Sequence, residues 1–314
     1  MRPSLRHRLV NAAHSVLLVA GMAGLAWACT GLIWGSGAAI WAFLIMGGML
    51  LLSVVMPLDL MLVLYGAQRI SPENFPEGIS ILKTLAKRAE LPQVPNFYYL
   101  PSALPNAFTT GHGKRTTIVV SDGLLRTLDP RELTAVLAHE ISHIAHGDMW
   151  ILRLADIMAR VTSIFSFAGQ VLVLINLPLV MIGAIHIPWA APLVLIFSPT
   201  VMSLLQLALS RSREFDADLG AARLTRDPAA LASALERLEH STGSFWEEIL
   251  LPGRRIPVPS LLRSHPPTEA RVARLKEIAL ELFRANPYSP TVPLPPAWAR
   301  EVRGPRWRRT GLWF

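Results

Sequence analysis

The sequence is poor in cysteine and in charge. Cys29 is its only cysteine and lies in an apolar stretch, which excludes a small secreted domain held together by disulfides. Charged residues make up 17% of the chain and apolar residues 52%, with a mean hydropathy of +0.39. This balance excludes disorder for most of the chain and is too apolar for an ordinary soluble enzyme. The sequence also contains no glycine-rich phosphate loop and no internal repeat.

Four long runs without a charged residue account for the hydropathy. They cover residues 16–34, 38–57, 161–185 and 187–209. About 20 apolar residues in a helix span a hydrocarbon layer about 30 Å thick, so we expect two transmembrane hairpins. The first run alone resembles a cleaved signal peptide, but such a signal is shorter and is not followed at once by a second run. Because the second hairpin contains several prolines, a hairpin that enters the membrane and returns remains an alternative to full crossing.

The basic residues indicate how these hairpins are oriented. The net charge of 30 − 22 = +8 suits nucleic acid and an anionic membrane equally well on arithmetic alone. Arginines flank the outer ends of the runs, and the short loops within the hairpins carry none. By the positive-inside rule, both termini and the middle segment lie on the cytoplasmic side of a multi-pass protein in the inner (plasma) membrane, which we expect to be bacterial. No nucleic-acid-binding module is recognisable, so we expect the bilayer and not nucleic acid as a partner.

The remaining segments have the composition of a globular domain. Apolar periodicity and capping residues predict helices, and β-branched or aromatic runs predict two strands that form a small antiparallel sheet. The helices are expected at 76–89, 130–146, 214–226, 228–240 and 268–285, and the strands at 96–100 and 116–120. The expected organisation is a transmembrane hairpin at 1–66, a first part of the globular domain at 67–160, a second hairpin at 161–209, a second part of the globular domain at 210–285 and a tail at 286–314.

The helix expected at 130–146 carries the motif that indicates chemistry. His139 and His143 are four residues apart and therefore lie on one helical face, where their imidazoles can bind one tetrahedral ion. Glu140 stands beside the coordination position that this ion leaves open for water. The spacing is the signature of a zinc hydrolase.

A catalytic zinc ion keeps three protein ligands and a water, so a third ligand must come from elsewhere. Glu214, directly after the fourth apolar run, is the best carboxylate. Asp218 follows on the same helical face and can accept a hydrogen bond from a zinc-bound histidine, for which His139 is the first choice. Two alternatives stay open: Glu214 as a surface acid paired with Arg211, and His146 as a competing ligand.

At five stretches the chain resembles the HtpX-like membrane zinc metallopeptidases, which are related to the CAAX prenyl-protein endopeptidases. These stretches are PNAFTTG at 105–111, VVSDGLL at 119–125, AHEISHIAHGD at 138–148, SREFDAD at 212–218 and SHPPTEAR at 264–271. The resemblance implies a mostly α protein, with helical membrane hairpins and a cytoplasmic zincin-like α+β catalytic domain that binds one Zn²⁺ per chain. The pair Phe215-Asp216 and the Pro-, Arg- and Trp-rich tail depart from the family pattern, which leaves regulation and substrate open.

The resemblance also implies roles that spacing alone does not give. His265 and Arg271 match family residues that face the zinc and stabilise the transition state, whereas by themselves they are a loop histidine and a solvated helix charge. Asn106, Ala107 and Phe108 match the segment that lines the substrate cleft, where an extended substrate adds as a strand; by themselves they are a turn and a core phenylalanine.

The expected activity is zinc-dependent hydrolysis of peptide bonds, with His139, His143 and Glu214 as ligands and Glu140 as general base. The expected substrates are polypeptides, above all membrane or misfolded proteins, in a stress-related quality-control role that the family suggests. The alternatives are a prenyl-peptide-processing endopeptidase of the CAAX type and a catalytically inert zinc-binding scaffold or holdase. The basic tail is expected either to lie on anionic lipid or to be merely solvated.

Overall fold

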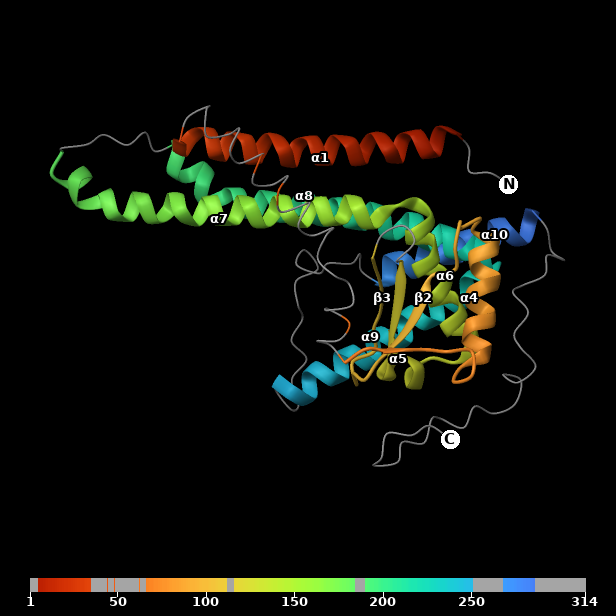
Figure 1. The fold of residues 1–314 in the computed structure, drawn as a ribbon. Coiled ribbons are helices and arrows are strands. Elements are labelled where there is room, and N and C mark those ends of the chain that lie inside the picture. Colours follow the sequence, from red (N-terminus) through yellow and green to blue (C-terminus); the bar gives the residue numbers. More distant parts are fainter. Residues whose placement is uncertain are drawn as a thin grey trace. The chain divides into compact units, whose positions relative to one another are not determined.

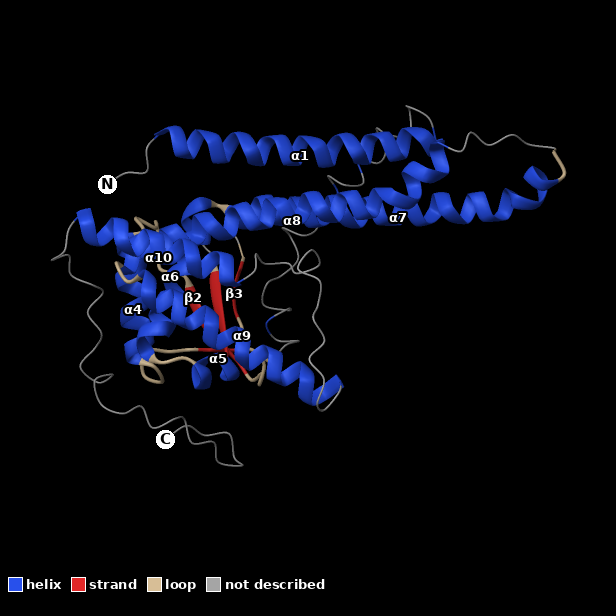
Figure 2. Ribbon diagram, turned by 180° about the vertical axis from the view of Figure 1, so that it is seen from behind, coloured by secondary structure: helices blue, strands red, loops and turns tan. Residues whose placement is uncertain are grey.

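A computed structural model of the chain describes residues 5–34, 66–111, 116–183, 190–250 and 268–285, with the isolated positions 44, 48 and 62. Most of these residues are helical, and four short strands form one sheet (Figures 1 and 2). The elements are α1 (Leu5–Trp34), β1 (Gln68–Arg69), α4 (Pro76–Arg88), β2 (Asn96–Leu100), β3 (Ala107–Thr110), β4 (Thr117–Ser121), α5 (Asp122–Thr127), α6 (Pro130–His146), α7 (Asp148–Met181), α8 (Ala190–Thr225), α9 (Pro228–Leu250) and α10 (Thr268–Ala285).

The chain divides into two compact units, and the described residues of the first unit are helical. It comprises Met1–Met56 and Trp150–Ser212, so it contains α1 and most of α7 and α8. Buried methionines from all three helices, Met22, Met158 and Met202, contribute to its apolar core. The predicted second apolar run, at 38–57, lies outside the described residues apart from two isolated positions.

Two helices of this unit are long and apolar enough to span a membrane. They are α7 and the Leu193–Thr225 portion of α8, whose most apolar 18-residue stretches have mean hydropathies of 2.0 and 1.9. Only 12% and 22% of their most apolar stretches are buried within the protein, whereas a core helix of a soluble protein would be mostly buried. Large apolar side chains such as Phe167 and Leu174 therefore face outward, as lipid contact requires. In α1 the apolar helical segment Ser15–Cys29 is shorter.

The second unit, Pro57–Met149 and Arg213–Phe314, contains the sheet and the motif helix. The strand order is β1-β2-β4-β3, and β2 pairs with β4 in parallel, whereas β3 pairs with β4 and β1 with β2 antiparallel. The prediction that 96–100 and 116–120 form an antiparallel sheet is therefore wrong. The reason is β3, which the sequence pattern indicated only as a turn: its hairpin with β4 places β4 between β2 and β3, and β4 then runs in the same direction as β2.

Helix α6 begins where the sequence pattern predicts it. The Asp129 side chain accepts a hydrogen bond from the Glu132 N–H, and the Glu132 side chain accepts one from the Asp129 N–H, which forms a complete capping box around Pro130. Gly147, at φ +69, ends the helix in the left-handed conformation. The helix is buried over most of its length and contacts α4, α9 and β3, so its position is fixed from several sides.

Helix α8 differs from its prediction. Residues 214–226 were expected to start a separate helix, but α8 continues without a break from the apolar segment through Glu214 to Thr225. No glycine or proline separates the two stretches, so nothing interrupts the hydrogen-bond ladder. The helix ends before Arg226, which adopts a φ of +58, and α9 begins at Pro228 as predicted. The helix at 268–285 is confirmed as α10.

Close packing at the start of α5 gives a stability prediction. A Cβ atom added to Gly123 would lie 2.0 Å from the carbonyl oxygen of Ala103, which is backbone and cannot rotate away. We expect Gly123→Ala to destabilise the protein by about 1–3 kcal/mol or more, because overpacking forces the backbone to shift. Thermal unfolding in detergent measures this as a lowered Tm. Gly24→Ala is the control, since nothing lies within 4 Å of its added Cβ; equal Tm values for the two variants would contradict the prediction.

Candidate metal centre

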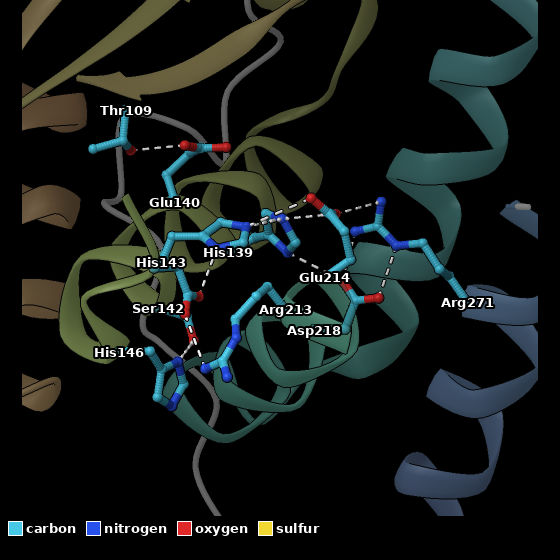
Figure 3. A network of polar contacts seen from close by, with 11 residues as sticks. Thr109, His139, Glu140, Ser142, His143, His146, Arg213, Glu214, Asp218 and Arg271 are labelled. Atoms are coloured by element: carbon cyan, nitrogen blue, oxygen red, sulfur yellow. Dashed lines mark hydrogen bonds and ion pairs between the residues drawn. The ribbon is translucent and has the colours of Figure 1, made fainter. Parts of the chain in front are cut away.

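Three side chains that can bind a metal converge in the second unit (Figure 3). His139 and His143 project from one face of α6, and Glu214 comes from α8. The two histidine Nε2 atoms lie 3.1 Å apart, and the Glu214 carboxylate oxygens lie 3.5 Å from His139 Nε2 and 3.8 Å from His143 Nε2. Around a tetrahedral zinc ion with ligand distances of about 2.0–2.2 Å, neighbouring ligand atoms are roughly 3.3–3.5 Å apart. The donor set therefore suits zinc, and the observed spacings of 3.1–3.8 Å lie within a few tenths of an ångström of this arrangement.

The expected partner of His139 is in place. Asp218 Oδ1 lies 3.0 Å from His139 Nδ1, and Arg271 donates to both Asp218 oxygens, from Nε at 2.8 Å and from Nη2 at 2.6 Å. Arg271 Nη1 also lies 3.1 Å from Glu214 Oε2. The structure thus brings Asp218 and Arg271 to the same centre, and it places Glu214 in the interior, 5% exposed, which is not the environment of a surface acid.

These contacts change the proton affinity of His139. Burial by itself lowers the pKa of the imidazole, but hydrogen bonds to Asp218 and Glu214 outweigh it and raise the pKa of His139 to about 9. The raised pKa favours the imidazolium form of this ring at neutral pH, and a metal ion must displace one of its two protons when it binds.

His143 has a matching partner that sequence reasoning missed. Its Nδ1 lies 2.9 Å from Asp148 Oδ2, and Arg213 Nη1 lies 3.3 Å from Asp148 Oδ1. Asp148 is fully buried as the first residue of α7. The available signal was weak: an acid directly after the glycine that ends the motif helix. His146, the competing ligand considered from the sequence, is instead exposed, with its Nδ1 3.2 Å from Ser142 Oγ.

Glu140 is held by a residue of the sheet. Thr109 on β3 donates a hydrogen bond of 2.7 Å from its hydroxyl to Glu140 Oε2, and Figure 3 shows the carboxylate pointing toward Thr109. With Glu140 only 8% exposed, this contact leaves its other oxygen, Oε1, for a further partner. Sequence reasoning did not single out Thr109, because the contact joins residues from two separate elements.

Thr109 should therefore affect catalysis through Glu140. We expect Thr109→Val, which keeps the shape but removes the hydroxyl, to lower kcat about tenfold while zinc content and KM stay near the original values. Thr109→Ser should restore most of the loss, since it returns the donor. Steady-state cleavage kinetics check both variants. Equal kcat values for the valine and serine variants would show that the hydroxyl has no such role.

The residues expected to line the cleft lie at the edge of the sheet. Ala107 and Phe108 are in β3, the last strand in the sheet order, and Asn106 precedes it. Asn106 is fixed by Ser121, since its N–H donates to Ser121 Oγ at 2.8 Å and its carbonyl accepts from the Ser121 N–H at 2.9 Å. Among the described residues, β3 pairs with β4 on one side and with no strand on the other. His265, expected to face the metal, lies outside the described residues.

Comparison with known proteins agrees with this geometry. The model of peptidase family M48 matches residues 72–279, which include all three candidate ligands. The protease HtpX homologue of Pyrococcus furiosus is 35% identical over 285 residues, covering 85% of this chain and 95% of that protein. The homologue of Burkholderia thailandensis is 32% identical over 289 residues, covering 86% and 98%.

A solved structure shares the fold. The crystal structure of S. mikatae Ste24p matches with a TM-score of 0.50 at 18% identity, covering 87% of this chain and 66% of that one. At such low identity the match bears on the fold alone. The family match extends from just before α4 into α10, and relatives nearly as long as this chain share about a third of its residues. The chain therefore belongs to peptidase family M48, as an HtpX-like metallopeptidase.

Proposed function

We propose that this protein is a membrane-embedded zinc endopeptidase that cleaves membrane or misfolded polypeptides. The observation that carries the proposal is the group of three ligand atoms from His139, His143 and Glu214, all within 4.8 Å of one another. The residue beside the first histidine is Glu140, the type of side chain that can serve as a general base. One Zn²⁺ per chain is the metal that two imidazoles and one carboxylate suit best.

When bound, zinc supplies Lewis-acid polarisation of the scissile carbonyl and makes a coordinated water more acidic. The protein's own residues handle the protons. Glu140 takes a proton from the attacking water as the oxygen bonds to the carbonyl carbon, and it delivers that proton to the nitrogen as the C–N bond breaks. Arg271 fixes the Glu214 and Asp218 carboxylates and adds positive charge beside the centre. We assign His265 to stabilise the developing oxyanion, as the family resemblance implies.

The substrate is proposed to bind as an extended chain along β3. An edge strand offers backbone N–H and C=O groups to a peptide, and Asn106, Ala107 and Phe108 stand at the start of this one. Because Thr109 of the same strand contacts Glu140, a peptide paired with β3 lies next to the general base. Backbone recognition of this kind accepts many sequences, which suits an enzyme that removes damaged proteins.

The proposed location is the inner (plasma) membrane of a bacterial cell, with the catalytic domain and both termini in the cytoplasm. Two long, outward-facing apolar helices support membrane insertion, and the arginines that flank the apolar runs support this orientation. The proposed role is quality control of membrane proteins. Cleavage of a farnesylated peptide in preference to an unfolded protein would instead favour the prenyl-processing alternative, and zinc binding without any product would favour the inert scaffold.

Removal of the metal tests the proposed activity. We expect the purified protein in detergent to contain one zinc per chain and to cleave casein. Dialysis against a chelator should abolish cleavage, and added zinc should restore it, because water activation depends on the ion. Metal analysis and gel-based detection of fragments provide the measurement. Cleavage that persists in fully zinc-free protein would refute the proposal.

A further inference from the structure

Behind the two histidines stand two similar pairs of charged residues. The pair behind His139, formed by Asp218 and Arg271, was expected in part from the sequence. The pair behind His143 is formed by Asp148 and Arg213, which lie in two of the family-like stretches but were assigned no role from the sequence. In both cases an aspartate faces the ring nitrogen opposite the metal side, and an arginine holds that aspartate.

Each atom of the second arrangement has a defined partner. Asp148 Oδ2 lies 2.9 Å from His143 Nδ1, and Asp148 Oδ1 lies 3.3 Å from Arg213 Nη1. An ionised carboxylate only accepts hydrogen bonds, so Nδ1 of His143 carries the proton and Nε2 keeps its lone pair for a metal ion. Asp148 is 0% exposed and Arg213 is 8% exposed, so solvent does not compete for these contacts.

The local backbone explains how Asp148 reaches His143. Gly147 ends α6 in the left-handed conformation, and Asp148 then begins α7. A carboxylate at the first turn of a helix is favoured by the unpaired N–H groups and the dipole there. Burial of this charge still requires a cation, which Arg213 supplies from α8.

Arg213 is also the residue directly before the proposed ligand Glu214. Consecutive residues of a helix point about 100° apart, so one turn of α8 can direct Glu214 to the metal and Arg213 to Asp148. The ion pair between Asp148 and Arg213 thereby joins the start of α7 to this turn of α8, on the Nδ1 side of His143. A shift between these two segments changes the support of His143 and the position of Glu214 at the same time.

We infer that Asp148 and Arg213 are positioning residues that fix the tautomer and orientation of His143, and that they make zinc affinity depend on the contact between the start of α7 and α8. This inference rests on the proposed zinc function. Substitution of a carboxylate that orients a metal ligand typically lowers metal affinity about 10- to 100-fold. We expect an effect of this size here.

The test measures zinc affinity in full-length protein by competition with a chromogenic chelator. Asp148→Asn should weaken zinc binding about 10- to 100-fold. Arg213→Gln should weaken zinc binding less. In the double variant, the loss of zinc affinity should be smaller than the two single losses multiplied together, because both single changes disrupt the same contact. The control is Asp156→Asn on the same helix, which removes an exposed acid paired with Arg160 and should leave zinc affinity unchanged.

The visible spectrum of cobalt-substituted protein reports the coordination geometry independently of activity. It should shift in Asp148→Asn and in Arg213→Gln but not in Asp156→Asn, whereas a merely structural role would lower Tm and leave the spectrum as it is. If Asp148→Asn does not fold, the Arg213→Gln variant alone tests the inference. An unchanged cobalt spectrum together with an unchanged zinc affinity in that variant would overturn it. Wild-type protein that binds no zinc refutes the proposed function, whereas tight binding by wild type and Asp148→Asn alike refutes only the positioning role.

Discussion

Glu140→Gln is expected to abolish proteolysis while the protein still holds one zinc per chain. The amide keeps the size of the carboxylate and can still accept the Thr109 hydrogen bond, but it cannot take a proton from water. Loss of a general base typically costs about 100- to 10,000-fold in rate, so cleavage of casein in detergent should fall below detection. Metal analysis of the same preparation separates this chemical loss from a loss of zinc.

The matched control for this variant is Glu132→Gln. Glu132 is a buried carboxylate on the same helix, 2% exposed, and its Oε1 lies 3.2 Å from Arg237 Nη2, away from the candidate ligands. This variant should keep its activity at temperatures where it remains folded. Casein cleavage at the wild-type rate by the Glu140→Gln protein would remove Glu140 from the mechanism.

The second large effect is expected from Glu214→Gln. A neutral amide is a poor zinc ligand and does not balance the charge of Arg271, whose Nη1 lies 3.1 Å from Glu214 Oε2. Substitution of a residue that only hydrogen-bonds to a ligand lowers metal affinity roughly 10- to 100-fold. Loss of a ligand itself should lower zinc affinity by more than this, and activity should be lost with it. Competition with a chelator gives the affinity, and the Glu132→Gln protein again serves as control. Full zinc occupancy at wild-type affinity in the Glu214→Gln protein would mean that the third ligand lies elsewhere.

The sequence predicts best what depends on local spacing. The pair His139 and His143 lies on one face because four residues make slightly more than one helical turn, and the capping box at Asp129 fixes where that helix begins. Glu214 was identified because it lies directly after the end of the fourth apolar run and because the family pattern matches there. The structure places one ligand atom from each of the three side chains within 4.8 Å of the others.

What the sequence could not predict depends on contacts between distant elements. The parallel pairing of β2 and β4 follows from β3, a four-residue strand whose pattern does not differ from that of a turn. The contacts of Thr109 with Glu140 and of Arg213 with Asp148 join separate elements, so no periodicity reveals them. The continuity of α8 was missed because the change from apolar to charged residues suggested a boundary, although a helix can continue through such a change.

That continuity has a consequence for how the enzyme is made. The ribosome releases α6 first, and the carboxylate that completes the donor set follows only after the whole of α7 and most of α8. A nascent chain that stops short of the end of α8 has both imidazoles but lacks the third donor. With Glu214 as the proposed third ligand, the zinc site is therefore expected to remain incomplete until α8 has been synthesised and has brought this carboxylate to the two imidazoles of α6.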